Sequence, residues 1–459
     1  MTHVVIIGGG PGGYEAALVA AQLGADVTLI ERDGIGGAAV LTDVVPSKSL
    51  IAVAEAATDS KGSSAIGVHA TNVTIDIAEV NSRLKKWAAT QSSDIYLRLQ
   101  SQGVKVIAGT AELVDAENVK AKLVDGSELN LIADVVLLAT GARPRELSSA
   151  VVDGVRILNW KQLYEFTELP SDLIVVGSGV TGAEFAGAYQ ALGSQVTLVS
   201  SRDQVLPSKD SEAGKVVQDV FVHRGMKILA HSRADQVTRT DTGVAVKLAT
   251  GEVITGSHCL MAVGSLPNTE GLGLDQVGIK TNDAGFIEVD KVSRTSVKGV
   301  YAAGDCTGIL MLASVAAMQG RIAMWHALGD AVHPLNLETV PSNVFTDPEI
   351  ATVGVSQADV DSGTEIANVF NLPLATNARA KMQGISEGFV KIFCRPDTGV
   401  IVGGVVVAPK ASELIFPIAL AVEHRLTVDQ MSQTITVYPS LSGSIAEAAR
   451  QLHQTQNLS

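Results

Sequence analysis

The feature that most constrains this chain is a glycine-rich pattern that occurs twice at a constant spacing. Each copy follows a short apolar run and precedes a stretch of helix-forming residues. The first and last glycines of the second copy lie 169 residues beyond those of the first (177 − 8 and 182 − 13). The two copies comprise the glycines Gly8, Gly10, Gly13, Gly177, Gly179 and Gly182. The sequence therefore predicts two similar strand–turn–helix units in one chain.

A strand, a G-x-G-x-x-G turn and a helix form the fingerprint of a dinucleotide site, because glycine lets the backbone approach a pyrophosphate at the helix N-terminus. In the first copy Glu31 ends the next apolar run, 18 residues beyond Gly13 (31 − 13), where a carboxylate binds a ribose hydroxyl. A glycine-rich turn without a ligand is the alternative, and the complete context favours binding. Two dinucleotide sites in one enzyme indicate hydride transfer between them.

The copies differ at the residue that ends the second strand. Ser200 takes the place of Glu31 (200 − 31 = 169), and Ser201 and Arg202 follow it. A carboxylate repels a 2′-phosphate, whereas this stretch removes the repulsion and supplies one cation. We interpret the first site as one for FAD and the second as a nicotinamide site that admits NADPH. Arg202 is equally well explained as a solvated surface arginine.

Further turns follow apolar runs and belong to the predicted sites. VVLLATGARPR reads as a buried strand followed by a turn, and GVYAAGDCTG places Asp305 at a strand end. There the Asp305 carboxylate is suited to a ribityl hydroxyl of a flavin, although a helix cap or turn is a common role for a lone aspartate. The additional residues assigned to the cofactor sites are Gly37, Thr140, Gly141, Gly264 and Ala313.

Length and composition indicate several α/β domains. The 459 residues exceed one core, and 46% of them are hydrophobic while 18% are charged. A net charge of −14 argues against nucleic-acid binding and against broad binding to anionic membranes. The three cysteines form neither a zinc-binding pattern nor a local dithiol, so no metal site is expected. The same cysteine usage favours a cytoplasmic location. No apolar run reaches about 18 residues, so no transmembrane segment is expected.

The last third of the chain changes character. From Pro341, strand-like runs alternate with turns and are followed by helical stretches, which predicts an α+β domain with an antiparallel sheet. Its apolar faces favour a homodimer interface. The expected domains are the first part of an FAD-binding domain at 1–150, an NAD(P)-binding domain at 151–269, the second part of the FAD domain with the central domain at 270–340, and a dimerisation domain at 341–459.

Together the repeated fingerprint, ATG, AAGD and VFTDPEIATVG resemble the flavoprotein disulfide reductase family, which includes dihydrolipoamide dehydrogenase and glutathione reductase. The resemblance covers essentially the whole chain. It implies non-covalent FAD, reduced by NADH or NADPH, that exchanges electrons with a redox disulfide on the other face of its ring. It also implies the domain order given above.

The disulfide of this family is absent. Its GG-T-C-x4-C-x-P-S-K stretch aligns with Gly36 to Lys48, and the two cysteine positions become Ala39 and Val44. Neither side chain forms a thiolate or a mixed disulfide. The family's His-Pro-Thr-x-x-Glu acid/base is missing too, since Tyr438 replaces its His and Gly443 its Glu. Loss of both the disulfide and the acid/base pair indicates a changed reaction.

The reductive half of the chemistry is retained. In the family, a lysine at the position of Lys48 lies by the flavin N5 and pairs with a glutamate that matches Glu184. Such a pair stabilises negative charge that develops as the hydride arrives. Without the motif, both residues would be ordinary solvated helix residues. We therefore predict that NAD(P)H reduces the flavin, with Lys48 and Glu184 as catalytic residues.

Electrons then pass directly to an acceptor. A pocket lined by Ala39, Val40, Leu41 and Val44 suits a flat apolar two-electron acceptor such as a quinone. The chain also resembles the cysteine-free, lipoamide-dehydrogenase-like NAD(P)H:quinone reductases, which share its NARAKM and VYPSLSGSI stretches.

We predict Tyr438 as the third catalytic residue, hydrogen-bonding a quinone carbonyl across the dimer interface, and interface packing is its alternative role. Thr42 and Asp43 either line the same cavity or form a turn.

Two alternatives to a quinone reductase stay open. One is an FAD/NAD(P)H oxidoreductase with another small or protein acceptor, such as a diaphorase or oxidase. The other is a non-catalytic, redox-sensing flavoprotein, which predicts erosion of the nicotinamide site or of the Lys48–Glu184 pair; neither is eroded.

Overall fold

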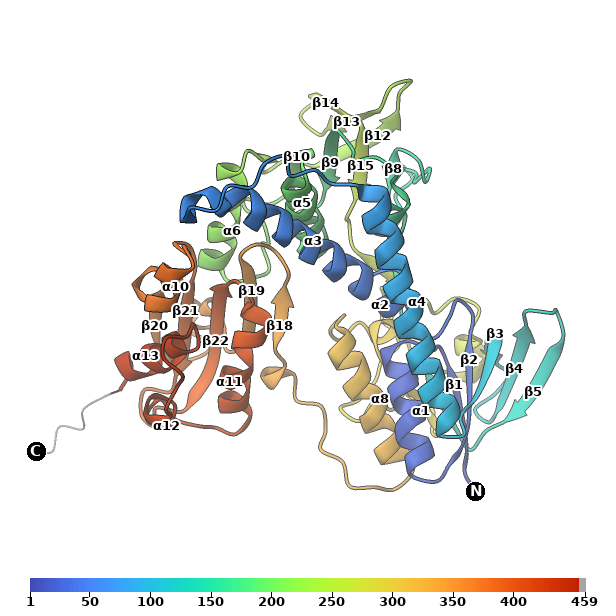
Figure 1. Ribbon diagram of the computed structural model, residues 1–459. Coiled ribbons are helices and arrows are strands. Elements are labelled where there is room, and N and C mark those ends of the chain that lie inside the picture. The colour runs from blue at the N-terminus through green and yellow to red at the C-terminus, as the bar shows by residue number, and fades with distance from the viewer. Residues whose placement is uncertain (454–459) are drawn as a thin grey trace, which may run out of the picture.

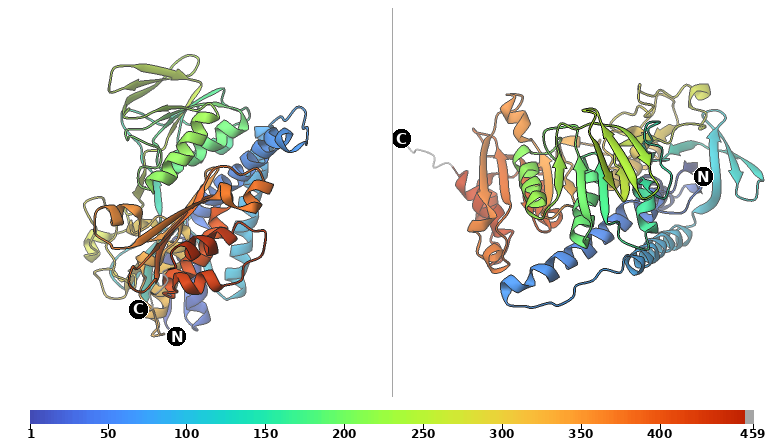
Figure 2. Two further views of the ribbon diagram at one scale, coloured as in Figure 1. Left: turned by 90° about the vertical axis from the view of Figure 1, so that its left-hand side faces the viewer. Right: turned by 90° about the horizontal axis from the view of Figure 1, so that it is seen from above.

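The computed structural model describes residues 1–453 and has a mixed α/β fold built around three main sheets (Figure 1). The N-terminal sheet and the C-terminal sheet lie on opposite sides of the molecule in Figure 1, with the domain of the second repeat above and between them. The long helices α3 (Val44–Gly62) and α4 (Ile77–Ser101) run along one side, as Figure 2 shows from above.

The first repeat lies in a seven-stranded sheet of order β17-β6-β1-β2-β3-β4-β5. The strands from β17 to β3 pair in parallel, and β3, β4 and β5 form an antiparallel meander. The central strands are buried on both faces, which explains their continuous apolar runs. The strands are β1 (His3–Ile7), β2 (Asp26–Glu31), β3 (Lys105–Leu113), β4 (Asn118–Leu123), β5 (Glu128–Ile132), β6 (Val135–Leu138) and β17 (Val300–Ala302).

Two helices pack on this sheet without large side chains between them. In α1 (Pro11–Gln22) and α8 (Ala313–Ala327), Gly12 faces Gly320, and a Cβ at Gly320 would overlap the carbonyl oxygen of Gly12. The two helices lie side by side in Figure 1. Small elements complete this part: α2 (Gly37–Leu41), α7 (Leu274–Val277), η1 (Ser63–Ile66) and η3 (Asp305–Thr307).

The second repeat lies in a five-stranded parallel sheet of order β11-β10-β9-β15-β8. Its strand register also repeats, since His3 pairs with Asp26 in the first sheet and Asp172 with Gln195 in the second, each shifted by 169. A three-stranded antiparallel sheet, β12-β13-β14, adjoins it.

The elements of this domain are β8 (Ile157–Leu158), η2 (Trp160–Glu165), β9 (Asp172–Val176), α5 (Val180–Leu192), β10 (Gln195–Val199), α6 (Ser211–His223), β11 (Lys227–Leu229), β12 (Ala234–Arg239), β13 (Val244–Leu248), β14 (Val253–Gly256) and β15 (His258–Met261). The two repeats are joined by a small antiparallel pair, β7 (Ala142–Pro144) and β16 (Ser265–Pro267). The exact domain boundaries stay predictions.

The C-terminal third contains the expected antiparallel sheet, of order β18-β19-β22-β21-β20, with helices beside it. Buried Lys391 of this sheet binds Asp210, at the start of α6, with 2.8 Å between nitrogen and oxygen. The elements are η4 (Leu337–Thr339), β18 (Ser342–Val344), β19 (Glu349–Gly354), α9 (Gln357–Asp361), β20 (Asn368–Pro373), η5 (Leu374–Thr376), α10 (Ala378–Met382), β21 (Phe389–Cys394), β22 (Ile401–Ala408), α11 (Ala411–Glu423), α12 (Val428–Gln433) and α13 (Gly443–Gln451).

One helical stretch meets the length and composition of a membrane span, although no uninterrupted apolar run of that length occurs in the sequence. It covers Gly37–Ile66, with a mean hydropathy of 1.4 over its best window, and a core helix of a folded protein passes the same test. Here the stretch is interrupted at Thr42 and Asp43, and α3 packs against α4 and α5.

Candidate active site

The first glycine-rich turn has the geometry that a pyrophosphate requires. Gly8 has φ +108°, and a Cβ there would overlap the carbonyl oxygen of Ala139; a Cβ at Gly13 would overlap that of Gly8. Gly10, by contrast, faces open space and immediately precedes α1. The two outer glycines thus allow the tight turn, and the middle one leaves room for a ligand at the helix N-terminus.

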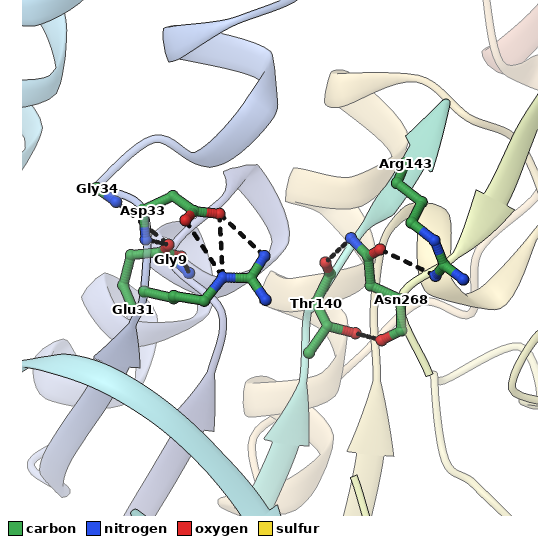
Figure 3. A network of polar contacts seen from close by, with 8 residues as sticks. Gly9, Glu31, Asp33, Gly34, Thr140, Arg143 and Asn268 are labelled. Carbon is green, nitrogen blue, oxygen red and sulfur yellow. Dashed lines mark hydrogen bonds and ion pairs between the residues drawn. The ribbon is translucent and has the colours of Figure 1, made fainter. Parts of the chain in front are cut away.

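Glu31 closes one end of this site (Figure 3). One carboxylate oxygen accepts a hydrogen bond from the Gly9 amide at 2.5 Å, and the other accepts from the amides of Asp33 at 2.6 Å and Gly34 at 3.3 Å. These bonds hold the carboxylate at the carboxyl end of β2, beside the turn, where a ribose hydroxyl would lie.

A cavity of about 940 Å³ extends from Glu31 and the first glycine turn to the helices α2 and α3. Its lining includes Gly37, whose φ of +58° and close approach to Gly10 (2.9 Å from a Cβ to the Gly10 Cα) require glycine. An elongated cavity with a pyrophosphate cradle and a carboxylate at one end fits FAD. Of the predicted flavin-site residues, the cavity is lined by Gly8, Gly10, Glu31, Gly37, Thr140, Gly141, Asp305 and Ala313.

The second turn repeats the first in detail. Gly177 has φ +111° and would overlap the Ala262 carbonyl if it had a Cβ, Gly182 would overlap the Gly177 carbonyl, and Gly179 faces open space. Gly264, with φ +95°, follows Ala262 at the end of β15. The backbone is therefore shaped to receive a second pyrophosphate.

The second site differs where Glu31 stands in the first. Ser200 is fully buried, and its hydroxyl lies 2.7 Å from that of Ser178, the counterpart of Gly9 (178 − 9 = 169). The Ser200 hydroxyl also accepts from the Arg202 amide at 3.1 Å. Ser200 thus shapes the turn from inside, and the Arg202 side chain is exposed. Their roles in coenzyme binding stay predictions.

Lys48 and Glu184 meet as predicted. The Lys48 Nζ lies 2.8 Å from a Glu184 oxygen, and the side chains are 26% and 4% exposed. The second Glu184 oxygen accepts from the Phe345 amide at 2.9 Å, and the Lys48 ammonium lies 5.0 Å from the centre of the Phe345 ring. The pair joins α3 to α5 and so links the two repeats. Neither residue lines the cavity itself, but Lys48 lies four residues beyond Val44, which does.

No thiol replaces the missing disulfide. Ala39 and Val44 line the cavity, in α2 and at the start of α3. Cys259, Cys306 and Cys394 are buried and free, and burial raises the pKa of their thiols to about 12, 11 and 11. None of the three lines this cavity, so a dithiol relay has no donor here.

Two of the carboxyl groups that line this cavity, those of Asp305 and Asp43, have raised pKa values. Burial, followed by the charge of Asp43, raises the pKa of Asp305 to about 6. Burial also raises the pKa of Asp43, against the lowering effect of Lys48. This acidic end of the cavity is next to Ala39 and Val44, where the family has its disulfide.

The sequence interpretation missed a set of hydrogen bonds between the repeats, here called the strap, which joins Thr140 and Arg143 to residues 267–270 (Figure 3). The Thr140 hydroxyl donates to the Asn268 carbonyl at 2.7 Å, and the Asn268 amide donates to the Thr140 carbonyl at 2.9 Å. Arg143 adds bonds to the Pro267 carbonyl at 2.8 Å and to Glu270 at 3.0 Å.

A signal for this strap was present. Gly141-x-x-Pro144 and Gly264-x-x-Pro267 each follow a buried strand, and both members are shifted by 123 residues (264 − 141 and 267 − 144). These segments are the ones that pair as β7 and β16.

Tyr438 does not line the cavity of its own chain. It is 84% exposed and follows α12 in the C-terminal domain, near other exposed apolar residues such as Ile435 and Val437. Its loop is held in place by the NARAKM stretch, since the Asn377 amide donates to the Ser440 carbonyl at 3.0 Å and to the Ser444 hydroxyl at 2.8 Å. Its catalytic role stays a prediction.

The comparisons with known proteins agree with this architecture. Residues 2–320 match the model of the pyridine nucleotide-disulphide oxidoreductase family, and residues 340–449 match the dimerisation domain of that family, which supports a homodimer.

Several relatives are similar over nearly their whole length. The chain is 55% identical to a Mycobacterium tuberculosis protein named NAD(P)H dehydrogenase (quinone), over 98% of this chain and 94% of that protein. It is 34% identical to the dihydrolipoyl dehydrogenase of Zymomonas mobilis, over 97% and 96%.

Solved structures show the same likeness. The crystal structure of LpdA from Mycobacterium tuberculosis matches with a TM-score of 0.96 and 55% identity, covering 99% of this chain and all of that one. The flavoprotein disulfide reductase RclA from Escherichia coli, at 22% identity and a TM-score of 0.87, supports the fold alone. Members of the matched family depend on FAD and NAD(P). On its sequence, fold and repeated dinucleotide geometry, this chain belongs to the pyridine nucleotide-disulphide oxidoreductase family.

Proposed function

We propose that this chain is an FAD-dependent NAD(P)H:quinone oxidoreductase that works without a redox disulfide. One observation carries the proposal: the Lys48–Glu184 ion pair is complete, at 2.8 Å, beside a cavity in which Ala39 and Val44 occupy the positions of the disulfide. The hydride-accepting side of the reaction retains its charges, and the side that would pass electrons to a thiol has become aliphatic.

The residues of the first repeat are suited to bind FAD without a covalent bond. Gly10 and the N-terminus of α1 would face the pyrophosphate, Glu31 a ribose hydroxyl, and Asp305 the ribityl chain. When bound, FAD supplies a ring that accepts a hydride and later releases two electrons. The Lys48 ammonium, held by Glu184, then stabilises the negative charge that hydride transfer creates.

The second repeat would bind the nicotinamide coenzyme at Gly177, Gly179 and Gly182, with Gly264 at the neighbouring strand end. Since no carboxylate occupies the position of Glu31, a 2′-phosphate meets no repulsion there, and exposed Arg202 supplies a cation. We therefore propose that NADPH is accepted as well as NADH.

A quinone suits the acceptor end of the cavity. Ala39, Leu41 and Val44 give it an apolar lining, and such a surface binds a flat, apolar two-electron acceptor. The name of the 55%-identical relative, NAD(P)H dehydrogenase (quinone), supports this acceptor class. We extend the proposal to a cytoplasmic homodimer in which the partner subunit brings its Tyr438 hydroxyl to a quinone carbonyl.

The test is anaerobic stopped-flow mixing of the purified holoenzyme with NADPH or NADH, followed by menadione, with the flavin absorbance recorded throughout. Fast bleaching by the coenzyme and fast recovery with menadione are the expected results. A dithiol substrate such as reduced lipoamide should give no turnover, because the described chain has no dithiol relay.

Each of the other outcomes would indicate a different function for this protein. Bleaching without recovery by any quinone would contradict the acceptor and leave a flavin oxidoreductase with another acceptor, such as a diaphorase or oxidase. Failure of both coenzymes to bleach the flavin would contradict catalysis altogether and leave a redox-sensing flavoprotein.

A further inference from the structure

Asp43 is the acidic residue closest in sequence to the lost disulfide, and the mechanism above gives it no task. It lies directly before Val44, at the interruption between α2 and α3, and lines the same cavity as Ala39 and Asp305. An aspartate that precedes a helix normally caps its first turn. Asp43 makes no such side-chain hydrogen bond, with φ −130° and ψ −90°. Its carboxyl group is therefore not engaged in holding the helix.

The groups around Asp43 come from four elements. Lys48 lies on α3, the helix that Asp43 precedes, while Glu184 comes from α5, Asp305 from η3, and Tyr164 from η2. Burial is the first cause that raises the pKa of Asp43; Lys48 opposes it and Glu184 adds to it. Since the Lys48 charge is already neutralised by Glu184 at 2.8 Å, the Asp43 carboxyl group has no ion-pair partner of its own among residues 1–453.

A buried hydroxyl next to this carboxyl group supports a role in proton handling. Tyr164 is 4% exposed, and among residues 1–453 its hydroxyl has no hydrogen-bond partner of ordinary geometry, although the nearby Ser47 hydroxyl lowers its pKa. Burial and then the Asp43 charge raise its pKa well above the ordinary value. A buried, unsatisfied hydroxyl is unfavourable, so it gains from a proton or water shared with the neighbouring carboxyl group.

The reaction requires a proton donor that the chain has otherwise lost. Reduction of a quinone to a quinol consumes one hydride and one proton. The family's histidine is replaced by Tyr438, which does not line the cavity of its own chain. Burial of a carboxyl group favours its protonated form, and that form can act as a general acid.

We propose that Asp43 is the catalytic acid that donates the proton to the bound acceptor at the position vacated by the disulfide. The proposal rests on the quinone reductase function. A hydride equivalent reaches the quinone, the O–H bond of the Asp43 carboxyl group breaks, and its proton forms the O–H bond at the quinone oxygen. The quinone is reduced to a quinol, and Asp43 remains as a carboxylate that regains a proton from solvent. With the proton thus supplied, NAD(P)H, a quinone and H⁺ give NAD(P)⁺ and a quinol.

The test compares Asp43→Asn with the parental holoenzyme and with Asp59→Asn, an exposed aspartate on the same helix α3. Flavin bleaching by NADPH should change by less than about threefold in either variant. Recovery with menadione should be slowed by about a hundredfold or more in Asp43→Asn alone, the effect typical of removing a general acid. Recovery with ferricyanide, which takes electrons without a proton, should be nearly unchanged.

The pH dependence gives an independent readout. The parental rate of recovery with menadione should fall as pH rises through the Asp43 pKa, and in Asp43→Asn this fall should disappear. Infrared spectra of the oxidised holoenzyme, which require no turnover, should show a protonated carboxyl band that titrates above the ordinary aspartate value of 3.8 and is missing in Asp43→Asn.

Two results would overturn the proposal while leaving the quinone reductase intact. One is equal recovery of Asp43→Asn and the parental enzyme with menadione at every pH. The other is an infrared titration of the oxidised parental holoenzyme that shows no carboxyl band titrating above 3.8, a measurement that needs no variant. If the parental enzyme itself is not reoxidised by any quinone, the proposed function fails first, and the role of Asp43 fails with it.

Discussion

The two dinucleotide repeats share a backbone and differ in the side chains placed upon it. Both have nearly the same positive φ at the first glycine, equivalent close contacts at the outer glycines and open space at the middle one. In the first repeat a Glu31 carboxylate faces the Gly9 amide; in the second, the Ser200 and Ser178 hydroxyls bond each other. The backbone geometry is thus the same in both repeats, whereas the side chains at the end of the second strand differ in charge.

A second pair of equivalent residues makes the same point. Glu15 and Glu184 occupy the same place in the two repeats (184 − 15 = 169). Glu15 binds Arg321 of α8 at 2.8 Å and helps to pack two helices of one domain. Glu184 is 4% exposed and binds Lys48 of the other repeat. In the first repeat this carboxylate holds two helices together, and in the second it forms an ion pair with a lysine of the other repeat.

The largest expected effect comes from breaking each turn separately. Gly13→Ala and Gly182→Ala each place a Cβ against a carbonyl oxygen. We expect Gly13→Ala to lose essentially all bound FAD, and Gly182→Ala to keep FAD but lose bleaching by NADPH. Flavin content, circular dichroism and stopped-flow absorbance measure this, with Gly62→Ala as the control because its Cβ would meet open space. Retention of FAD by Gly13→Ala would contradict the assignment of the first site.

The acidic end of the first site predicts a pH-dependent stability of the flavin-free protein. The pKa of Asp305 rises from 3.8 to about 6 on folding, so folding favours its protonated form. Its stabilising contribution is complete below pH 3.8 and is lost as pH rises through about 6. Asp305→Asn should remove this loss, so that above pH 6 its free energy of unfolding exceeds that of the parental protein by up to about 3 kcal/mol. Urea unfolding from pH 4 to 8 measures it, and parallel curves for variant and parent would refute it.

The Lys48–Glu184 pair should matter for flavin reduction, unlike its counterpart in the first repeat. In Lys48→Met/Glu184→Gln both charges are removed, so that no buried carboxylate is left unpaired. We expect flavin reduction by NADPH to slow by roughly a hundredfold, with FAD retained. The matched variant, Arg321→Met/Glu15→Gln, should reduce within about twofold of the parental rate. Equal rates for the two double variants would disprove the special role of Lys48.

The smallest effect is expected from substitutions that make the second repeat resemble the first. Ser178→Gly/Ser200→Glu recreates the pair found at Gly9 and Glu31. The new carboxylate should repel the 2′-phosphate and lower kcat/KM for NADPH relative to NADH by about tenfold, or about 1.4 kcal/mol. Ser178→Gly alone is the control and should leave the ratio unchanged. An unaltered ratio in the double variant would show that coenzyme choice is made elsewhere.

Much of the fold followed from local patterns. The glycine spacing predicted both turns, the apolar runs predicted β1, β6 and β17, and the alternation after Pro341 predicted the antiparallel sheet. These features are set by backbone geometry and by burial of near neighbours in sequence, and both leave periodic traces. The meeting of Lys48 with Glu184 was predicted only through the family resemblance, because 136 residues separate them.

Other parts of the site could not be predicted in this way. Thr42 and Asp43 were also explicable as turn formers. Only the packing of α3 against α5, together with the approach of Asp305, shows what faces the Asp43 carboxyl group. The bonds between Thr140 and Asn268 join segments 128 residues apart. Buried Lys391 lies in an apolar strand, and only the structure shows that it binds Asp210.

The sequence by itself determined that the chain has two dinucleotide turns, that the second lacks a carboxylate, and that no cysteine occupies the disulfide positions. Those conclusions depend only on which residues occur at short spacings, and the sequence contains this information directly. The tertiary structure decided that Ala39, Val44, Asp43 and Asp305 line one cavity and that the Lys48–Glu184 pair links the repeats beside it. Burial and charge act through space, so the environment of each carboxyl group exists only once distant segments have packed together.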